Sequence, residues 1–313
     1  MHVAIMSNQE IGNSLEDEIN TREVFFALWH SKIIIIIMVA IFAVGSIFYS
    51  LSIPNQFTSS SLLKISNSGS SQSSSNSNLD MIGSLAGINF SGAGTSKSSL
   101  VTATIESRDF LKHLLTFDKV LPSIVAIQSY DKETGELIFN DSIYDQKNNT
   151  FTSDPEKKPT FHKTYLTYNN MINISTTNTG YIYLSVTHLS PKFAYELLNL
   201  IISEVNSLSR ARVLQESKDS LNFLYNQLTE TNQIEIKNSI NLIIESELRK
   251  QMLAEVQKNY LINPLDKPFF PEMKSSPNRA RICILGTILG FLLSILVSLV
   301  KYYGFSSRQY KEL

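Results

Sequence analysis

Two long runs of apolar residues, one near each end of the chain, constrain this sequence more than any other feature. Residues 33–53 read IIIIIMVAIFAVGSIFYSLSI and residues 282–300 read ICILGTILGFLLSILVSLV, and neither run holds a charged side chain. An α-helix rises about 1.5 Å per residue, so each run is about 30 Å long, enough to cross the hydrocarbon core of a bilayer. Core helices of soluble proteins seldom stay apolar all round for so long. The sequence therefore predicts two transmembrane helices.

Two spans place both tails of the chain, residues 1–32 and 301–313, on the same side of the membrane. The first run is too long for the apolar part of a signal peptide, and no small-residue cleavage site follows it. Positive charges are nearly balanced across the spans, but the loop of residues 54–281 is long enough to be translocated largely regardless of its charge. We expect cytoplasmic tails and an external domain. The only cysteine, Cys283, lies inside the second run, and an external domain without disulfides is common in a bacterial periplasm.

The external domain mixes strand and helix patterns, which predicts an α+β fold. Residues 57–65 read as a strand, and two alternating segments around residues 172–175 and 181–186 predict a hairpin with its turn at residues 178–180. Residues 100–115 carry apolar side chains at helical spacing. Between these elements, residues 67–78 are almost all Ser, Asn, Gln and Gly, which predicts a mobile loop. Residues 117–160 are polar and rich in turn formers, with no clear pattern.

A long helix is predicted over about residues 191–260, because this stretch contains neither proline nor glycine and begins with the helix-start pair Ser190-Pro191. A continuous helix over residues 214–260 would be about 70 Å long, and a domain of this size cannot cover both sides of it. We therefore expect the helix to project from the base and to pack beside other copies. The alternative is two shorter helices folded back at residues 229–233, where the apolar stripe weakens.

The segment between the long helix and the second span predicts a stiff extended connector over residues 264–277, because prolines cannot continue a helix and favour extended chain. Its prolines are Pro264, Pro268, Pro271 and Pro277. The second span carries a stripe of small residues at every fourth position, which lets two helix backbones approach closely. The stripe consists of Gly286, Gly290, Ser294 and Ser298, and Gly45 in the first span is a candidate facing residue.

No pattern in the chain points to catalysis. The five histidines are scattered without ligand spacing, so we expect no metal site: His2, His30, His113, His162 and His188. Neither a phosphate-binding GK[ST] loop nor a nucleophile elbow occurs, and neither span carries an ionisable side chain. The net charge of −1 argues against a nucleic-acid partner. We expect a protein without catalytic residues or cofactor that acts by binding and positioning.

Several segments resemble the Wzz chain-length determinants, which are bacterial polysaccharide co-polymerases. The resemblance begins with residues 18–29, continues through the first span and includes PNQFTSS at residues 54–60. The segment ESRDFL at residues 106–111 resembles the short helix that follows the family's Gly/Ser loop. The four connector prolines, followed by NRA at residues 278–280, are similar to the family's carboxy-terminal signature.

The resemblance implies a homo-oligomer in the bacterial inner membrane, with periplasmic domains that form a ring or bell, an α/β base near the membrane and long helices above it. It implies control of the number of repeat units that a membrane polymerase adds to a lipid-linked glycan, O-antigen or a related polysaccharide, without catalysis. An alternative is an adaptor that activates a separate cytoplasmic tyrosine kinase in capsule or exopolysaccharide export. The tail tyrosines would leave room for such a partner: Tyr302, Tyr303 and Tyr310. A third hypothesis, a two-span sensor, would require a signalling domain that the short tails lack.

Overall fold

The computed structural model describes residues 28–29, 31–66, 93–131 and 134–309, and these divide into two compact units. One unit contains residues 1–53 and 277–313, and the other contains residues 54–276. The expected Gly/Ser-rich loop at residues 67–78 lies outside the described residues.

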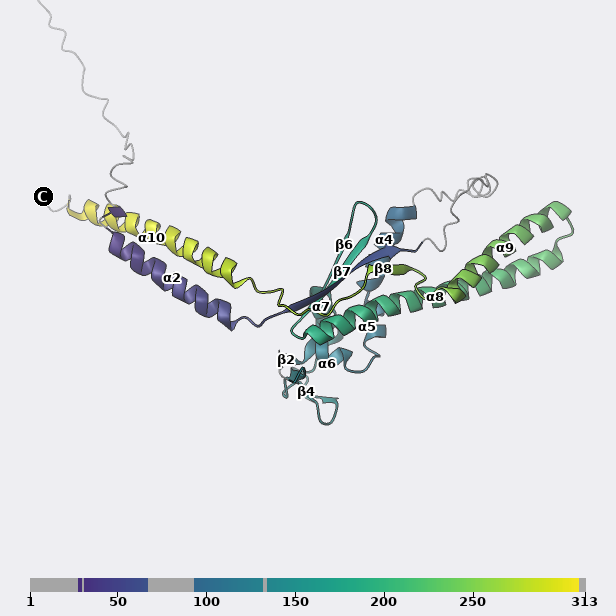
Figure 1. The fold of residues 1–313 in the computed structure, drawn as a ribbon, viewed down its shortest axis with the longest axis horizontal. Helices are drawn as coiled ribbons and strands as arrows, with labels where there is room; N and C mark the ends of the chain where they lie inside the picture. The colour runs from purple at the N-terminus through teal and green to yellow at the C-terminus, as the bar shows by residue number, and fades with distance from the viewer. Residues whose placement is uncertain (1–27, 30, 67–92, 132–133, 310–313) are drawn as a thin grey trace, which may run out of the picture. The chain divides into compact units, whose positions relative to one another are not determined.

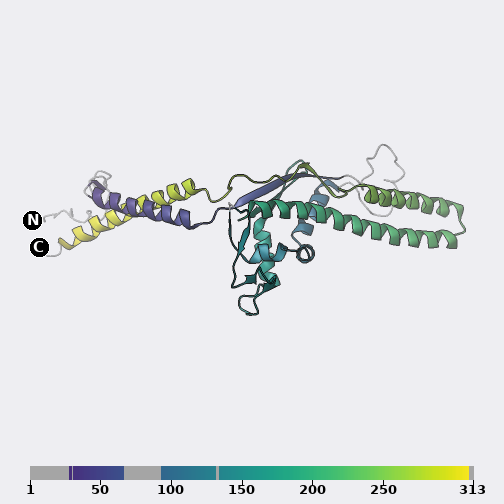
Figure 2. The same cartoon turned by 60° about the horizontal axis from the view of Figure 1, so that its bottom comes forward.

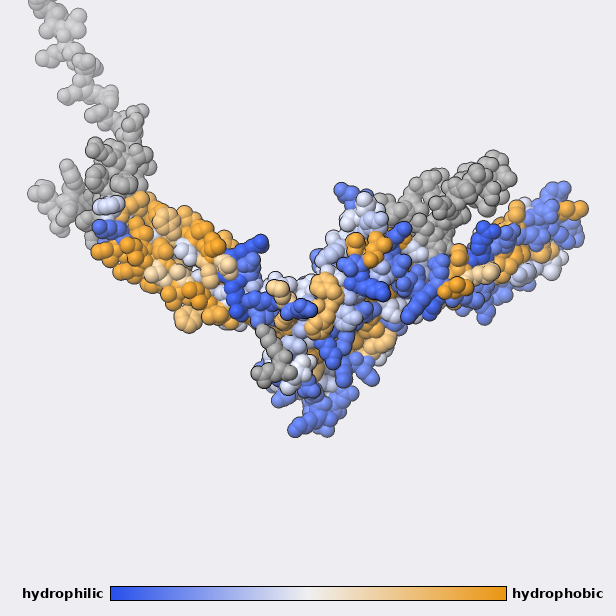
Figure 3. Space-filling view, viewed as in Figure 1, coloured by the Kyte–Doolittle hydropathy of each residue, from blue (hydrophilic) through white to orange (hydrophobic). Residues whose placement is uncertain are grey.

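The first unit is a pair of packed, membrane-capable helices, α2 (Lys32–Ser52) and α10 (Arg279–Gln309). Only 11% and 17% of their most apolar windows are buried, so most of their apolar surface is free to face lipid. This surface forms the densest apolar region of Figure 3. Helix α10 begins at an Asn cap, because the Arg281 backbone N–H donates to Asn278 Oδ1 at 3.2 Å. The predicted architecture, two membrane-capable helices flanking a mixed domain, is confirmed.

The second unit is built on a four-stranded antiparallel sheet in the order β6-β7-β1-β8 (Figure 1). Its strands are β1 (Phe57–Ile65), β6 (Ile172–Thr176), β7 (Ile182–His188) and β8 (Ile262–Asp266). The first three were predicted, and their positions are confirmed. Gly180 adopts φ +82° in the β6–β7 turn, a conformation that glycine takes without steric cost.

Strand β8 corrects part of the connector prediction, because the connector's first residues form an edge strand rather than a separate extended segment. Pro264 lies in this strand and pairs with Leu63 across from it. Proline cannot donate a ladder hydrogen bond and is therefore confined to edge positions of a sheet. The β1–β8 register shifts between Leu62 and Leu63, directly beside the proline.

The core of the second unit lies between the sheet and the amino-terminal half of α8 (Pro191–Glu230), with three smaller helices around it. These helices are α4 (Ala93–Ile105), α5 (Arg108–Leu114) and α7 (Phe161–Met171). The single helix predicted at residues 100–115 is wrong, since the chain forms α4 and α5 instead. Ser107 causes the break, because its hydroxyl caps α5 by accepting the Phe110 N–H at 3.1 Å.

The long helix predicted over residues 191–260 is two helices, α8 and α9 (Ile234–Val256), packed side by side (Figures 1 and 2). The single projecting rod is therefore wrong, and the folded-back alternative is confirmed. Thr231 and Gln233 take extended backbone conformations and reverse the chain without a glycine or proline. The apolar stripe faces inward, where Leu221, Ile240 and Ile244 form a small core of their own.

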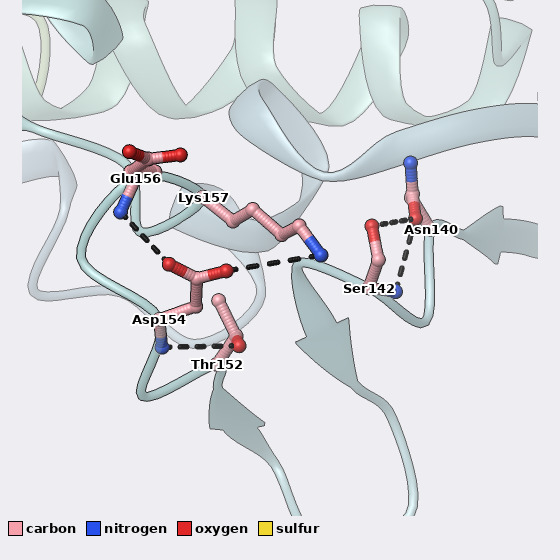
Figure 4. A network of polar contacts seen from close by, with 6 residues as sticks. All are labelled: Asn140, Ser142, Thr152, Asp154, Glu156 and Lys157. Carbon is pink, nitrogen blue, oxygen red and sulfur yellow. Dashed lines mark hydrogen bonds and ion pairs between the residues drawn. The ribbon is translucent and has the colours of Figure 1, made fainter.

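The polar centre of the sequence folds into one helix and two small hairpins. These are α6 (Val120–Val125), β2 (Ile127–Tyr130) with β3 (Leu137–Phe139), and β4 (Tyr144–Asp145) with β5 (Thr150–Phe151). Side chains close its turns (Figure 4). The backbone N–H and the hydroxyl of Ser142 donate to Asn140 Oδ1 at 3.0 and 2.7 Å, and the Glu156 N–H donates to Asp154 Oδ1 at 3.0 Å. Such side-chain turns replace the backbone ladder that this segment largely lacks.

One buried side chain of α8 forms hydrogen bonds with the residues that follow the helical hairpin. Asn206 of α8 is 3% exposed and donates from Nδ2 to the carbonyls of Ile202 and Ile262 at 3.0 and 2.9 Å. Its Oδ1 accepts the backbone N–H groups of Leu261 and Ile262 at 2.9 and 3.0 Å. The Asn206 side chain therefore provides hydrogen-bond partners for the backbone groups at the start of β8.

We predict that Asn206→Ala lowers the free energy of unfolding by about 2–4 kcal/mol, because several buried backbone groups lose their partner at once. Asn199→Ala is a matched control, since Asn199 also donates to the carbonyl four residues earlier, Tyr195, but is exposed. Pulse proteolysis of the full chain in urea measures both changes. Equal effects of the two substitutions would mean that Asn206 contributes only its local helix contact.

Candidate functional site

The small-residue stripe of the second span lies against the first span of the same chain. A Cβ added to Gly286 would lie 2.5 Å from Ser46 Cβ, and one added to Gly290 would lie 2.5 Å from Phe42 Cβ. Both distances are shorter than any carbon–carbon contact can be, so only glycine permits this approach. The other two members of the stripe, Ser294 and Ser298, are fully buried.

Gly45 does not make the close approach that the sequence suggested for it. A Cβ on Gly45 would meet nothing within 4 Å. Gly45 instead borders an apolar cavity between the two helices, which Gly286 and Tyr49 also line. The close contact of α2 is therefore made by Phe42 and Ser46, which flank Gly45 in the sequence.

The four connector prolines lie in different settings. Pro264 is part of β8, and Pro271 is buried beside Phe57 and Tyr130 in a shallow groove. Pro268 and Pro277 are partly exposed outside any strand or helix. The connector is therefore anchored at Pro264 and Pro271 rather than extended freely along its length.

The carboxy-terminal half of α9 carries exposed apolar side chains. Leu248, Met252 and Val256 recur every fourth residue and share one side of the helix. Met252 and Val256 are 64% and 83% exposed. Figure 3 shows apolar residues along the hairpin among hydrophilic ones. An apolar helix face that the described residues leave uncovered is typical of an association surface. We call Leu248, Met252 and Val256 the α9 face.

A cleft in the second unit lies between the polar centre of the chain and the first turns of α8. Its lining combines aromatic, amide and charged side chains: Phe139, Tyr144, Asn149, Lys119, Lys192 and Glu196. Lys119 and Asn149 are the non-glycine residues with positive φ among the described residues, at 68° and 53°. The Tyr144 hydroxyl donates to Asn149 Oδ1, and the Tyr144 ring contacts Phe139 and Phe151 at 5.2 and 5.0 Å between centroids. This lining can bind a polar ligand with an apolar face.

A buried histidine joins this cleft to the start of α8. The Ser190 backbone N–H donates to His188 Nδ1 at 3.0 Å, so Nε2 carries the proton and donates to the Ser123 carbonyl at 3.0 Å. The ring also packs on Phe193 at 4.6 Å between centroids. Burial lowers the pKa of His188 from 6.5 to about 4, although the hydrogen bond from Nε2 to the Ser123 carbonyl acts in the opposite direction. The neutral ring therefore holds α6 and the cap of α8 together.

The family comparison reports on the amino-terminal part of the chain. Residues 17–116 match the family model of the Wzz chain length determinant protein. The resemblance predicted from the sequence is thereby confirmed over the matched residues, which include the first span, β1 and α5.

Solved structures similar to this chain include polysaccharide co-polymerases. One is a full-length bacterial polysaccharide co-polymerase, 14% identical, which covers 91% of this chain and 97% of its own, with a TM-score of 0.35. Another is a fragment of WzzB, the polysaccharide co-polymerase from Salmonella Typhimurium, 14% identical, which covers 71% of this chain and 100% of its own, with a TM-score of 0.29. The comparison with curated proteins finds no match.

Sequence reasoning missed two of these surfaces. The α9 face was hidden because its residues were assigned to one continuous helix with a single stripe. The cleft was missed because its lining combines residues that lie far apart in the chain, such as Tyr144 and Lys192. The one local signal was the concentration of aromatic residues at Phe139, Tyr144 and Phe151 within an otherwise polar stretch.

We predict that Gly290→Ala destabilises the helix pair by about 1–3 kcal/mol, because the added Cβ would overlap Phe42 and force α2 and α10 apart. Gly45→Ala is the matched control. Its Cβ meets open space, and alanine is the better helix former, so this variant should be as stable as the parent or slightly more stable. The midpoint of thermal unfolding, measured on the full chain in detergent, distinguishes the two variants. Equal midpoints would mean that the helices can repack without the glycine.

We predict that His188→Gln weakens the pH dependence of stability between pH 6.5 and 4. In the parent, the unfolded chain takes up a proton on His188 below pH 6.5, whereas the folded chain does so only near pH 4. The free energy of unfolding therefore falls as the pH is lowered through this window, by about 3 kcal/mol from this residue alone. Pulse proteolysis at several pH values tests this. Parallel curves for parent and variant would exclude His188 as the titrating group.

Proposed function

We propose that this protein is a two-pass inner-membrane regulator of polysaccharide chain length that acts as a homo-oligomer with a membrane polymerase. The glycan would be O-antigen or a related lipid-linked polysaccharide, and the domain of residues 54–276 would lie in the periplasm. The Wzz match and the two membrane-capable helices around a larger domain support this proposal. The regulator would not be an enzyme; it would bind and position the growing glycan and the polymerase.

The observation that carries the proposed assembly is the uncovered α9 face. Met252 and Val256 each expose most of an apolar side chain to water, which is unfavourable by about 25 cal/mol for each Å². Contact with the hairpins of neighbouring copies would remove this cost. A ring of copies also repeats any weak contact with the glycan many times, and repeated weak contacts raise the overall avidity strongly. The cleft beside α8 is one surface that could supply such contacts.

The proposal predicts that replacing Leu248, Met252 and Val256 together with Gln reduces the size of cross-linked oligomers and shifts the length distribution of the surface polysaccharide. Ser239→Gln with Ser246→Gln is the control, because these exposed serines lie on the same helix away from the α9 face. Gel analysis of surface polysaccharide from cells carrying each variant, beside a deletion strain, provides the readout.

The deletion strain also separates this proposal from the adaptor hypothesis. Altered glycan length with unchanged tyrosine phosphorylation supports the regulator. Loss of tyrosine phosphorylation together with loss of export, rather than altered length, would support the kinase adaptor. Unchanged oligomers and unchanged glycan in the α9-face variant would remove this face from the mechanism.

A further inference from the structure

The connector holds three large apolar side chains that the part of the chain described by the structure leaves about half exposed or more. Phe269, Phe270 and Met273 are 49%, 50% and 81% exposed. We call these three residues the connector patch. Three such residues within five positions are unusual on a water-facing surface and are typical of a contact site. The proposed assembly through the α9 face does not involve them.

The backbone beneath the connector patch is fixed by hydroxyl groups of β1. Ser59 Oγ donates to the Phe269 carbonyl at 2.8 Å, and Ser61 Oγ donates to the Asp266 carbonyl at 2.5 Å. Farther along, the Ser275 N–H donates to the Gln56 carbonyl at 2.9 Å. Because one side of the patch is bound to β1 and the other to Gln56, the residue just before β1, the exposure of its side chains belongs to the folded unit.

The patch also lies where the chain connects to both spans. Gln56 pairs with Ser276, and these residues follow the end of α2 and precede the start of α10 by only a few positions. Met273 is six residues from Arg279, and six extended residues reach at most about 20 Å. The patch is therefore tethered within this distance of a membrane-capable helix.

Two exposed lysines, Lys267 and Lys274, flank the patch. The acids of the same segment are Asp266, before Lys267, and Glu272, between the two lysines. Aromatic and cationic side chains beside a span are the composition found at a membrane–water interface. Exposed lysines near a bilayer are attracted to anionic headgroups.

We propose that the connector patch inserts into the headgroup region of the bilayer, with Phe269, Phe270 and Met273 against the acyl boundary and Lys267 and Lys274 against anionic phosphates. The occupant of this surface is the lipid surface itself. Insertion would give the domain a third attachment to the membrane, beside its two covalent connections to the spans. This inference does not depend on the proposed function in chain-length control.

The test uses the full chain with its only cysteine removed by Cys283→Ala and a spin label on a single new cysteine. Met273→Cys reports on the connector patch. Ile138→Cys is the control, because Ile138 is an exposed apolar residue of β3, 46% exposed, away from the α9 face. In nanodiscs of phosphatidylcholine and phosphatidylglycerol, collisions with oxygen, which enters the bilayer, are compared with collisions with a water-soluble nickel chelate.

We expect the ratio of oxygen to nickel collisions to be several-fold higher at position 273 than at position 138. A second variant with Phe269→Ser and Phe270→Ser should lower the ratio at position 273 while leaving the urea transition in pulse proteolysis unchanged. Equal ratios at both positions would overturn the proposal. A label at position 273 that neither reagent reaches would also overturn it, because protein rather than lipid would then cover the patch.

Changing the lipid composition tests whether Lys267 and Lys274 contact anionic headgroups. Replacing phosphatidylglycerol with phosphatidylcholine should lower the ratio at position 273, and Lys267→Gln with Lys274→Gln should remove that dependence. A ratio that is the same in both lipids would overturn the headgroup contact of the lysines.

Discussion

The second unit depends on the attachment of a single edge strand to a long helix, which the buried amide of Asn206 provides. The chain leaves the base along α8, reverses at residues 231–233 and returns along α9 before β8 begins. Asn206 meets the chain at this return and satisfies the backbone groups of Leu261 and Ile262. The pairing of β8 with β1 has a register shift and a proline that cannot donate a hydrogen bond, so the contacts of Asn206 add to a weak edge pairing. The buried Ile262 side chain and the Ser61 hydroxyl, which donates to the Asp266 carbonyl, also hold this strand.

The parts of this fold that could be predicted from sequence are those that local chemistry decides. The two spans follow from length and lack of charge, and β6 and β7 follow from alternation around a Gly180 turn. The cap of α8 follows from Ser190-Pro191, and in the structure the Ser190 hydroxyl accepts the Phe193 N–H. In each case a few neighbouring residues carry the whole signal, so no knowledge of distant contacts was needed.

The predictions that failed concern features that contacts between distant residues decide. Whether residues 191–260 form a rod or a hairpin is decided by Leu221 meeting Ile240 and Ile244, and by the Ser217 hydroxyl bonding Glu247 across the two helices. No glycine or proline marks the reversal, so the weak stripe at residues 229–233 was the only local sign. The break before α5 was easier to predict from the sequence, because Ser107 is a good cap residue. However, the apolar spacing on both sides of Ser107 indicated one continuous helix. The cleft and its aromatic cluster required the pairing of β2 with β3 and of β4 with β5, which a polar segment does not reveal.

The structure also gives different roles to the small-residue stripe of α10 and to the apolar surface of the helical hairpin. The small-residue stripe was expected to bring helices together, and in this chain Gly286 and Gly290 meet Ser46 and Phe42 of the same chain. That face of α10 is therefore occupied within the unit described here. Ser294 and Ser298 are buried as well, so little of the stripe is left exposed for a neighbour. The proposed contacts between copies would then use other surfaces, and the α9 face is an apolar one that the described chain leaves open. Loss of helix packing and loss of oligomers are thus expected from different substitutions, since Gly290→Ala acts on the first and the α9-face variant acts on the second.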